Sequence, residues 1–179
     1  MAEHLKHHRR STRIPAFDYA GPGAYFITLV THGRAHLFGE IVDGEMRLNA
    51  AGRIAQLERE NLPRRFRFIA LGTFVVMPNH FHGIVILHPS VGATRLDSTI
   101  ATYDSVPLPG LPASGAGGSP LPRGPGSRSL GMAIAQLKPR VTKRIWKLRR
   151  AQGIPVWQRN YYEHVIRDEQ DWNRICLYI

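Results

Sequence analysis

The stretch "FRFIALGTFVVMPNHFHGIVILH", Phe66 to His88, is two apolar segments joined through Met77-Pro78-Asn79, a pattern that predicts two buried strands. The second segment carries two histidines, His80 and His82, one residue apart. Side chains alternate along a strand, so these imidazoles share a face about 7 Å apart. They could converge on one metal ion or one phosphate. The alternative is that each is an ordinary polar residue on a half-exposed strand.

The bulk composition favours a nucleic-acid partner. The chain has 179 residues, a formal net charge of +11 and one cysteine. Such a charge favours a polyanion, and nucleic acid before a membrane. No apolar run approaches the roughly 20 residues that span a bilayer, and the basic N-terminus lacks the apolar core of a secretion signal. We therefore expect a cytoplasmic protein with no membrane partner.

The order of expected elements predicts the fold class. It is strand, hairpin, helix, two strands, helix, short strand and helix, which favours an α+β fold, an antiparallel sheet with helices packed on one face. The first half of the chain is expected to hold a central strand at 24–32, a hairpin turning at Asp43-Gly44, and a helix from Asn49 to about Leu62 stopped by Pro63. The two strands within 66–88 follow. The last part is expected to hold a basic helix at 130–150, an extended segment at 155–166 and a final helix at 167–179 with an acidic first turn.

The chain is predicted to hold one domain. Residues 1–19 have the composition of a basic arm, and the domain spans 20–179. A segment at about 90–128 is rich in Gly, Pro, Ser and Ala without periodicity, which indicates a flexible insertion within that domain.

The residues near the histidine pair argue against zinc. A zinc-protease helix would need His-Glu-x-x-His, which is absent, and a His-x-His-x-Asp loop would need an acid where Ile84 stands. With one cysteine there is no cysteine cage. A divalent site for Mg²⁺ or Mn²⁺ fits His80 and His82 better.

Two motifs resemble one family. "MPNHFHGIVIL" and "VWQRNYYEHVIRDEQDWNRICLYI" look like the REP-associated tyrosine transposases, a branch of the single-tyrosine HUH endonucleases in the IS200-like transposase superfamily. The resemblance covers residues 25–179 apart from the insertion. It implies a ferredoxin-like HUH core that cleaves single-stranded DNA beside hairpins of REP-like repeats. Cleavage would pass through a 5′-phosphotyrosine intermediate, with Mg²⁺ or Mn²⁺ held by His80 and His82.

The resemblance also suggests the nucleophile. Family members carry it in a helical Tyr-Ile pair shortly before Asn-Pro, and here that pair is Tyr178-Ile179. Tyr161 and Tyr162 are the alternatives. Because the chain ends at Ile179, before any Asn-Pro, we expect it to be truncated and its cleavage to be impaired.

Several further residues are candidates for DNA contact. His164 matches the family's Tyr-x-His-x-Ile-Arg segment and could support the site, or it could make a structural hydrogen bond. The cations could meet phosphate, the alternative for each being a solvated or salt-bridged side chain. They are Lys138, Arg140, Lys143, Arg144 and Lys147 in the basic helix, with Arg159 and Arg167 beyond it.

Two other functions stay open at this point. The chain could be a non-catalytic module, derived from such a transposase, that binds hairpin DNA or RNA. It could also be a metal-dependent phosphodiesterase that uses water. A covalent protein–DNA adduct is expected only of the tyrosine enzyme. Monomer and homodimer are both compatible with the sequence.

Overall fold

The architecture is built on a four-stranded antiparallel sheet in the order β4-β5-β1-β6. It is seen in a computed structural model that describes residues 21–89 and 128–179. The arm expected at 1–19, and the insertion expected at about 90–128 except its last residue, lie outside the described residues. In chain order the elements are β1 (Gly23–Val30), the short helix η1 (His32–Arg34), β2 (Gly39–Val42), β3 (Glu45–Leu48), α1 (Ala50–Glu60), α2 (Leu62–Arg65), β4 (Ile69–Met77), β5 (His80–Leu87), α3 (Leu130–Arg149), β6 (Tyr162–Ile166) and α4 (Glu169–Tyr178).

The central position of β1 follows from its side chains. It is hydrogen-bonded to β5 on one side and to β6 on the other, as its apolar and β-branched composition predicts. Tyr25, Ile27 and Leu29 enter the main core with α1, α2 and α3. Phe26 points the other way, into a second and smaller core. The α+β prediction is confirmed.

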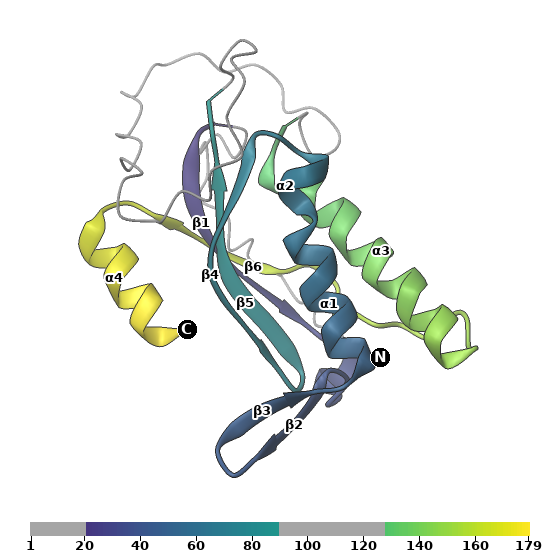
Figure 1. The fold of residues 1–179 in the computed structure, drawn as a ribbon. Coiled ribbons are helices and arrows are strands. Elements are labelled where there is room, and N and C mark those ends of the chain that lie inside the picture. The colour runs from purple at the N-terminus through teal and green to yellow at the C-terminus, as the bar shows by residue number, and fades with distance from the viewer. Residues whose placement is uncertain (1–20, 90–127) are drawn as a thin grey trace, which may run out of the picture.

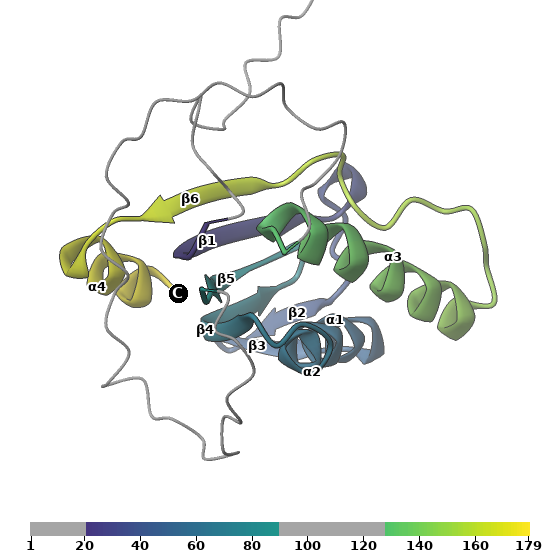
Figure 2. The ribbon, with the colours of Figure 1, turned by 90° about the horizontal axis from the view of Figure 1, so that it is seen from above.

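The helices do not all lie on one face, which corrects part of the expected arrangement. Figure 2 shows the sheet edge-on, with α1, α2 and α3 on one side and α4 on the other. The physical reason is that the second face is also apolar. Ile84, Ile86 and Ile166 point away from the main core and would meet water without Trp172 and Ile175 of α4.

The β4–β5 hairpin contains a bulge that explains one glycine and one buried arginine. The strand register shifts between Leu71 and Phe74. A Cβ at Gly83 would lie 2.5 Å from the Cβ of Phe74, so only glycine fits there. Arg59 of α1 donates from Nη2 to the carbonyl oxygens of Gly72 (2.6 Å) and Ile84 (3.3 Å). The arginine thereby satisfies backbone acceptors at the bulge.

Turn and cap chemistry sets the remaining boundaries. Asp43 and Gly44 have φ of 53° and 81°, the left-handed conformation of a tight hairpin turn, which confirms the β2–β3 hairpin (Figure 1). Asn49 caps α1 by accepting from the Ala51 and Gly52 amides. Pro63 lies in the first turn of α2, and α3 continues through Pro139 as one helix. In the described parts of the chain, no helix combines the length and apolar character that crossing a bilayer requires.

Candidate active site

The two histidines open strand β5, where the preceding turn is firmly held. His80 is paired with Val30 and Met77, and His82 with Thr28 and Val75. The buried Thr31 donates to the Asn79 carbonyl from its backbone amide (2.9 Å) and from its hydroxyl (2.9 Å). These bonds fix the turn and therefore the direction in which both imidazoles leave the strand.

Both imidazoles have lowered pKa values, which favours their neutral form at pH 7. Burial, with a smaller contribution from the charge of a protonated His80, lowers the pKa of His82 to about 4, and its residue is only 6% exposed. Burial also lowers the pKa of His80. The ring centroids are 5.0 Å apart. Two neutral imidazoles on one face are in the protonation state that metal binding requires.

A hydrogen bond sets the tautomer of His80. Its Nδ1 lies 2.8 Å from Oδ1 of Asn79. An amide oxygen can only accept, so Nδ1 carries the proton and Nε2 keeps its lone pair. A ligating histidine is commonly oriented in this way through its second nitrogen. The bond therefore leaves His80 with one nitrogen available to a ligand.

Helix α4 brings Tyr178 to the histidine pair. Its ring centroid lies 5.2 Å from that of His82 and 6.1 Å from that of Phe26. The helix is placed by Ile175, Trp172 and Cys176, which pack on the second core. Tyr178 is 68% exposed, so a ligand can reach it. His80, His82 and Tyr178, predicted from separate motifs, thus lie together on one face of the sheet.

The other two candidate tyrosines are placed differently. Tyr162 begins β6, is 49% exposed, and lies with its ring centroid 6.5 Å from that of Phe26. Tyr161 is partly buried against the main core, behind the sheet as seen from His82. Tyr162 therefore shares the face of Tyr178, whereas Tyr161 packs on the opposite one.

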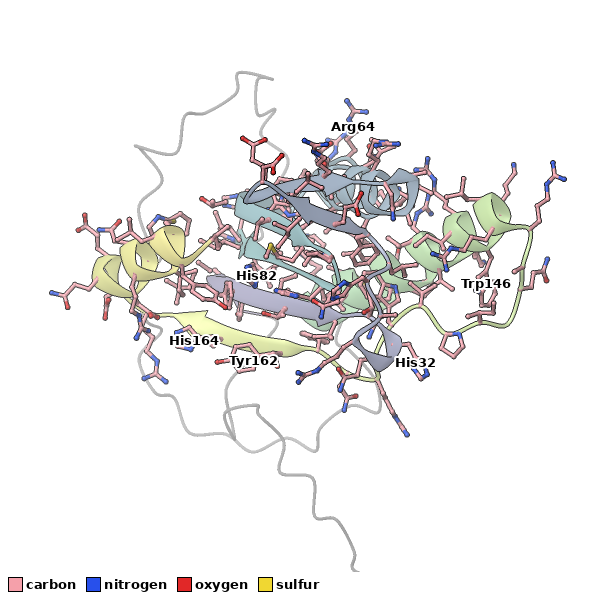
Figure 3. All side chains as sticks on the ribbon, turned by 90° about the horizontal axis from the view of Figure 1, so that it is seen from below. His32, Arg64, His82, Trp146, Tyr162 and His164 are labelled. Carbon is pink, nitrogen blue, oxygen red and sulfur yellow. The ribbon has the colours of Figure 1, made fainter. Side chains whose placement is uncertain are left out.

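A charged network joins β6 to α4 beside the tyrosines. His164 Nε2 lies 2.7 Å from Oδ2 of Asp171, and Arg174 Nη2 donates to Oδ1 of the same carboxylate. Burial alone would raise the pKa of Asp171, but the hydrogen bonds from His164 and Arg174 hold that pKa below its usual range. Figure 3 shows His164 next to Tyr162 along β6. The structural hydrogen bond that was one alternative for His164 is present.

Phe26, Asp171 and Arg174 belong to this site, although the sequence did not single them out. Asp171 counted only toward the acidic first turn of a helix, and Phe26 only toward the pattern of a central strand. The one sequence signal for the network was the helical spacing that puts Asp171 and Arg174 on adjoining positions of the same face.

On this face the described residues form at least two grooves. One, of about 270 Å³, runs between β6 and α4, and the other, of about 430 Å³, continues past the start of α4. His164 and Arg174 line both. The first groove is lined by Phe26, Tyr162, His164, Arg174, Ile175 and Tyr178, and the second by His164, Arg167, Asp168, Gln170, Asp171 and Arg174.

The cations of α3 are not near the histidine pair. Helix α3 covers the main core, and the sheet separates it from α4, the helix that carries Tyr178 (Figure 2). Lys138 donates to the carbonyls of Gln158 (2.8 Å) and Asn160 (2.9 Å), and burial lowers its pKa. Lys143 and Lys147 are exposed. Among the predicted DNA contacts beyond α3, Arg159 and Arg167 are exposed, and Arg167 lines the second groove.

Arg140 and Arg144 are ion-paired with one acid on α1. Glu58, whose side chain is 4% exposed, accepts from Arg140 (3.2 Å), Arg144 (2.9 Å) and Arg65 (2.7 Å). Burial alone would raise the pKa of Glu58, but the hydrogen bonds from Arg144, Arg65 and Arg140 lower it. The salt-bridged alternative therefore holds for these two arginines, whose acidic partner lies far away in sequence.

Replacing Glu58 by glutamine should lower the free energy of unfolding by about 2–3 kcal/mol, because it leaves three arginines around a neutral amide. The arginines are partly exposed, so the loss is smaller than for a fully buried pair. Urea denaturation at pH 7 measures it. Glu60→Gln, an exposed change on the same helix, is the control and should stay within about 0.5 kcal/mol of the parent. Equal stability of the two variants would contradict a structural role for Glu58.

Among residues 21–89 and 128–179, no acid, cysteine or further histidine completes a group of three around the histidine pair. The protein groups that face a ligand at this point are therefore two imidazoles and one phenol. Any divalent ion held there would take most of its coordination from water and from its substrate, as Mg²⁺ commonly does.

Comparison with known proteins identifies a relative in sequence and a relative in fold. No protein-family model matches the chain. It is 35% identical over 174 residues to an uncharacterized protein of Haemophilus influenzae, a match that covers 97% of this chain and 87% of that protein. The structure of a REP-associated tyrosine transposase bound to a REP hairpin superposes with a TM-score of 0.52 at 16% identity.

That superposition covers 88% of this chain and 64% of the transposase, so the chain spans less than two thirds of the transposase's length. At this identity the likeness shows a shared fold. A candidate transposase from Deinococcus radiodurans aligns with a TM-score of 0.43 at 14% identity over 93% of this chain and 95% of its own. That score is too low to add to the comparison.

Proposed function

Because the chain belongs to the same family as the Haemophilus influenzae protein and has a transposase-like fold, we propose that it is a DNA-processing enzyme of the tyrosine HUH type. In this proposal it cleaves single-stranded DNA beside a hairpin and links the 5′ phosphate to Tyr178. A hairpin substrate is proposed because the transposase of similar fold was solved bound to a REP hairpin.

The observation that carries the proposal is the contact between Tyr178 and His82. The two come from α4 and β5, yet their ring centroids lie 5.2 Å apart, with His80 beside them. A phosphate approached by both imidazoles would lie within reach of the exposed tyrosine. A nucleophile next to an electrophile-binding pair is the arrangement that phosphoryl transfer needs.

In this proposal Tyr178 carries out a single displacement reaction at phosphorus. Its oxygen forms a bond to phosphorus, the bond from phosphorus to the 3′ oxygen breaks, and the 3′ oxygen leaves as a hydroxyl. The phenol gives up its proton to solvent and the leaving oxygen takes one from solvent, so atoms and charge balance. A protonated phenol is a weak nucleophile, so the attack depends on the positioning of Tyr178 and on electrostatic stabilisation of the phosphate.

His80 and His82 fit two places in a divalent metal site. Both have lowered pKa values, both lie on one face, and the Asn79 amide leaves Nε2 of His80 with its lone pair. Bound Mg²⁺ or Mn²⁺ would supply positive charge to the phosphate oxygens. The role of the protein is to orient the two imidazoles and to favour their neutral form at pH 7.

The exposed lysines of α3 are proposed to contact the DNA away from the site, since the sheet lies between. Lys143 and Lys147 are one helical turn apart and share a face. Replacing both by glutamine should reduce the slope of log affinity against log salt by about 1.5 units, at 0.7–0.9 for each phosphate that the protein no longer neutralises. Fluorescence anisotropy with a hairpin oligonucleotide over a salt series measures the slope. Arg47→Gln, on the largely acidic β2–β3 hairpin, is the control and should leave the slope unchanged. Equal slopes for the parent, the double lysine variant and Arg47→Gln would show that α3 does not contact the DNA.

A second candidate is a DNA-binding module without catalysis. It is favoured by the absence of a third acidic or histidine ligand in the described part of the chain. An oligonucleotide labelled at its 3′ end distinguishes the two functions, since the label stays on the fragment that carries the 5′ phosphate. The enzyme is expected to form a labelled band that survives denaturing electrophoresis when Mg²⁺ or Mn²⁺ is present. A module would bind the oligonucleotide and give no such band.

A further inference from the structure

Apart from Tyr178, the residues that line the groove of about 270 Å³ between β6 and α4 have no part in the proposed cleavage chemistry. Tyr162 and Tyr178 border it, and Phe26 contacts both, with ring centroids 6.5 Å and 6.1 Å away in edge-on geometry. Ile175 adds an aliphatic side chain. Two of the residues that line the groove, His164 and Arg174, are polar, so one groove offers both aromatic surface and hydrogen-bond donors.

We propose that this groove binds one unpaired nucleobase of the DNA strand, next to the phosphate that Tyr178 attacks. This rests on the function proposed above and names a base-binding subsite for it. The base would stack on the exposed ring of Tyr162, with Phe26 below, and turn its polar edge toward His164 and Arg174. Base–aromatic stacking tolerates any base, because every base has a π face.

The charges of the groove suit a neutral, planar group rather than a second phosphate. Asp171 is paired with both His164 and Arg174, so much of the positive charge at the polar end is already balanced. Guanidinium and imidazole donors can still meet the oxygens and ring nitrogens on a base edge. Tyr162 itself is half exposed on the edge strand β6 and lines the groove.

The test uses the full chain and a DNA hairpin with a single-stranded thymidine flank, without divalent metal so that no cleavage intervenes. One abasic position is moved along the flank, and the duplex fixes the register. For the parent protein, an abasic site at one particular position of the flank should weaken binding about 5- to 150-fold, and abasic sites elsewhere should not. Tyr162→Ala should bind the intact flank more weakly by a similar factor and become indifferent to that position.

Matched variants separate stacking from folding. Tyr162→Phe keeps the ring and should behave as the parent does, while Tyr162→Leu keeps apolar bulk in β6 and should behave as Tyr162→Ala does. Thermal unfolding checks each variant, and Tyr162→Leu is used for the test if Tyr162→Ala fails to fold. The inference is overturned if no abasic position stands out with the parent, or if the leucine variant keeps the parent's position dependence. Adduct formation by Tyr178 is measured separately, so either proposal can fail without the other.

Discussion

Tyr178→Phe should remove the covalent protein–DNA adduct while leaving DNA affinity within about twofold of the parent. The change deletes one oxygen and keeps the ring that lies 5.2 Å from His82 and packs beside Phe26. Removing the nucleophile from a covalent enzyme costs on the order of 10³-fold or more, because the residual rate uses another path. Denaturing electrophoresis of a 3′-labelled hairpin substrate with Mg²⁺ or Mn²⁺ measures the loss, and anisotropy measures the affinity.

Tyr162→Phe is the control for this experiment. It removes the same atom from the neighbouring tyrosine on the same face, so it should still form the adduct. If Tyr178→Phe retained the adduct and Tyr162→Phe lost it, the nucleophile would lie on β6. The attacking oxygen would then belong to Tyr162 and lie near His164 instead of His82.

His80→Ala should lower adduct formation at least about a hundredfold at fixed metal concentration and leave hairpin affinity without metal nearly unchanged. Replacing a residue that only orients a metal ligand commonly lowers metal affinity or activity 10- to 100-fold, so replacing a ligand itself should cost more. His80 is the better choice of the pair, because His82 is buried beneath Tyr178 and its removal would also open a cavity. Metal titrations of adduct yield measure the effect.

An exposed histidine provides the matched control. His36 lies in the loop between η1 and β2, and His36→Ala should give the parent's metal titration. The metal assignment would be contradicted by equal adduct yields in His80→Ala and the parent at every metal concentration. Unchanged yields in the presence of a strong chelator would contradict it as well.

Most of the sheet could be predicted because its signals are local. Alternation in β1 and the Asp43-Gly44 turn each depend on residues a few positions apart. The shared face of His80 and His82 follows from the same alternation. The sequence alone did not predict which face of the sheet α4 would cover. An apolar stripe along a helix indicates that the helix packs on a core, but it does not indicate on which face of the sheet. The apolar residues on both faces of β1 and β5 were the signal for a second layer.

The roles of the basic residues depend on contacts that no local pattern contains. Arg140 and Arg144 looked uncompensated because α3 itself has no acid, but Glu58 reaches them from α1. Lys138 is similarly occupied by the backbone before β6. Long-range pairs of this kind are set by how helices pack. Composition could therefore predict a basic helix without predicting which of its cations are exposed.

The central claim is that Tyr178 forms the covalent bond to DNA, and peptide mass mapping tests it most directly. The adduct is formed with metal, trimmed with nuclease and digested with trypsin, which cleaves after Arg159, Arg167 and Arg174. The candidate tyrosines then fall on separate peptides, Tyr178 on residues 175–179 and Tyr161 with Tyr162 on residues 160–167. We predict a nucleotide mass on the 175–179 peptide, attached to Tyr178. A nucleotide mass on the 160–167 peptide, or none on either peptide when cleaved DNA is present, would contradict the claim.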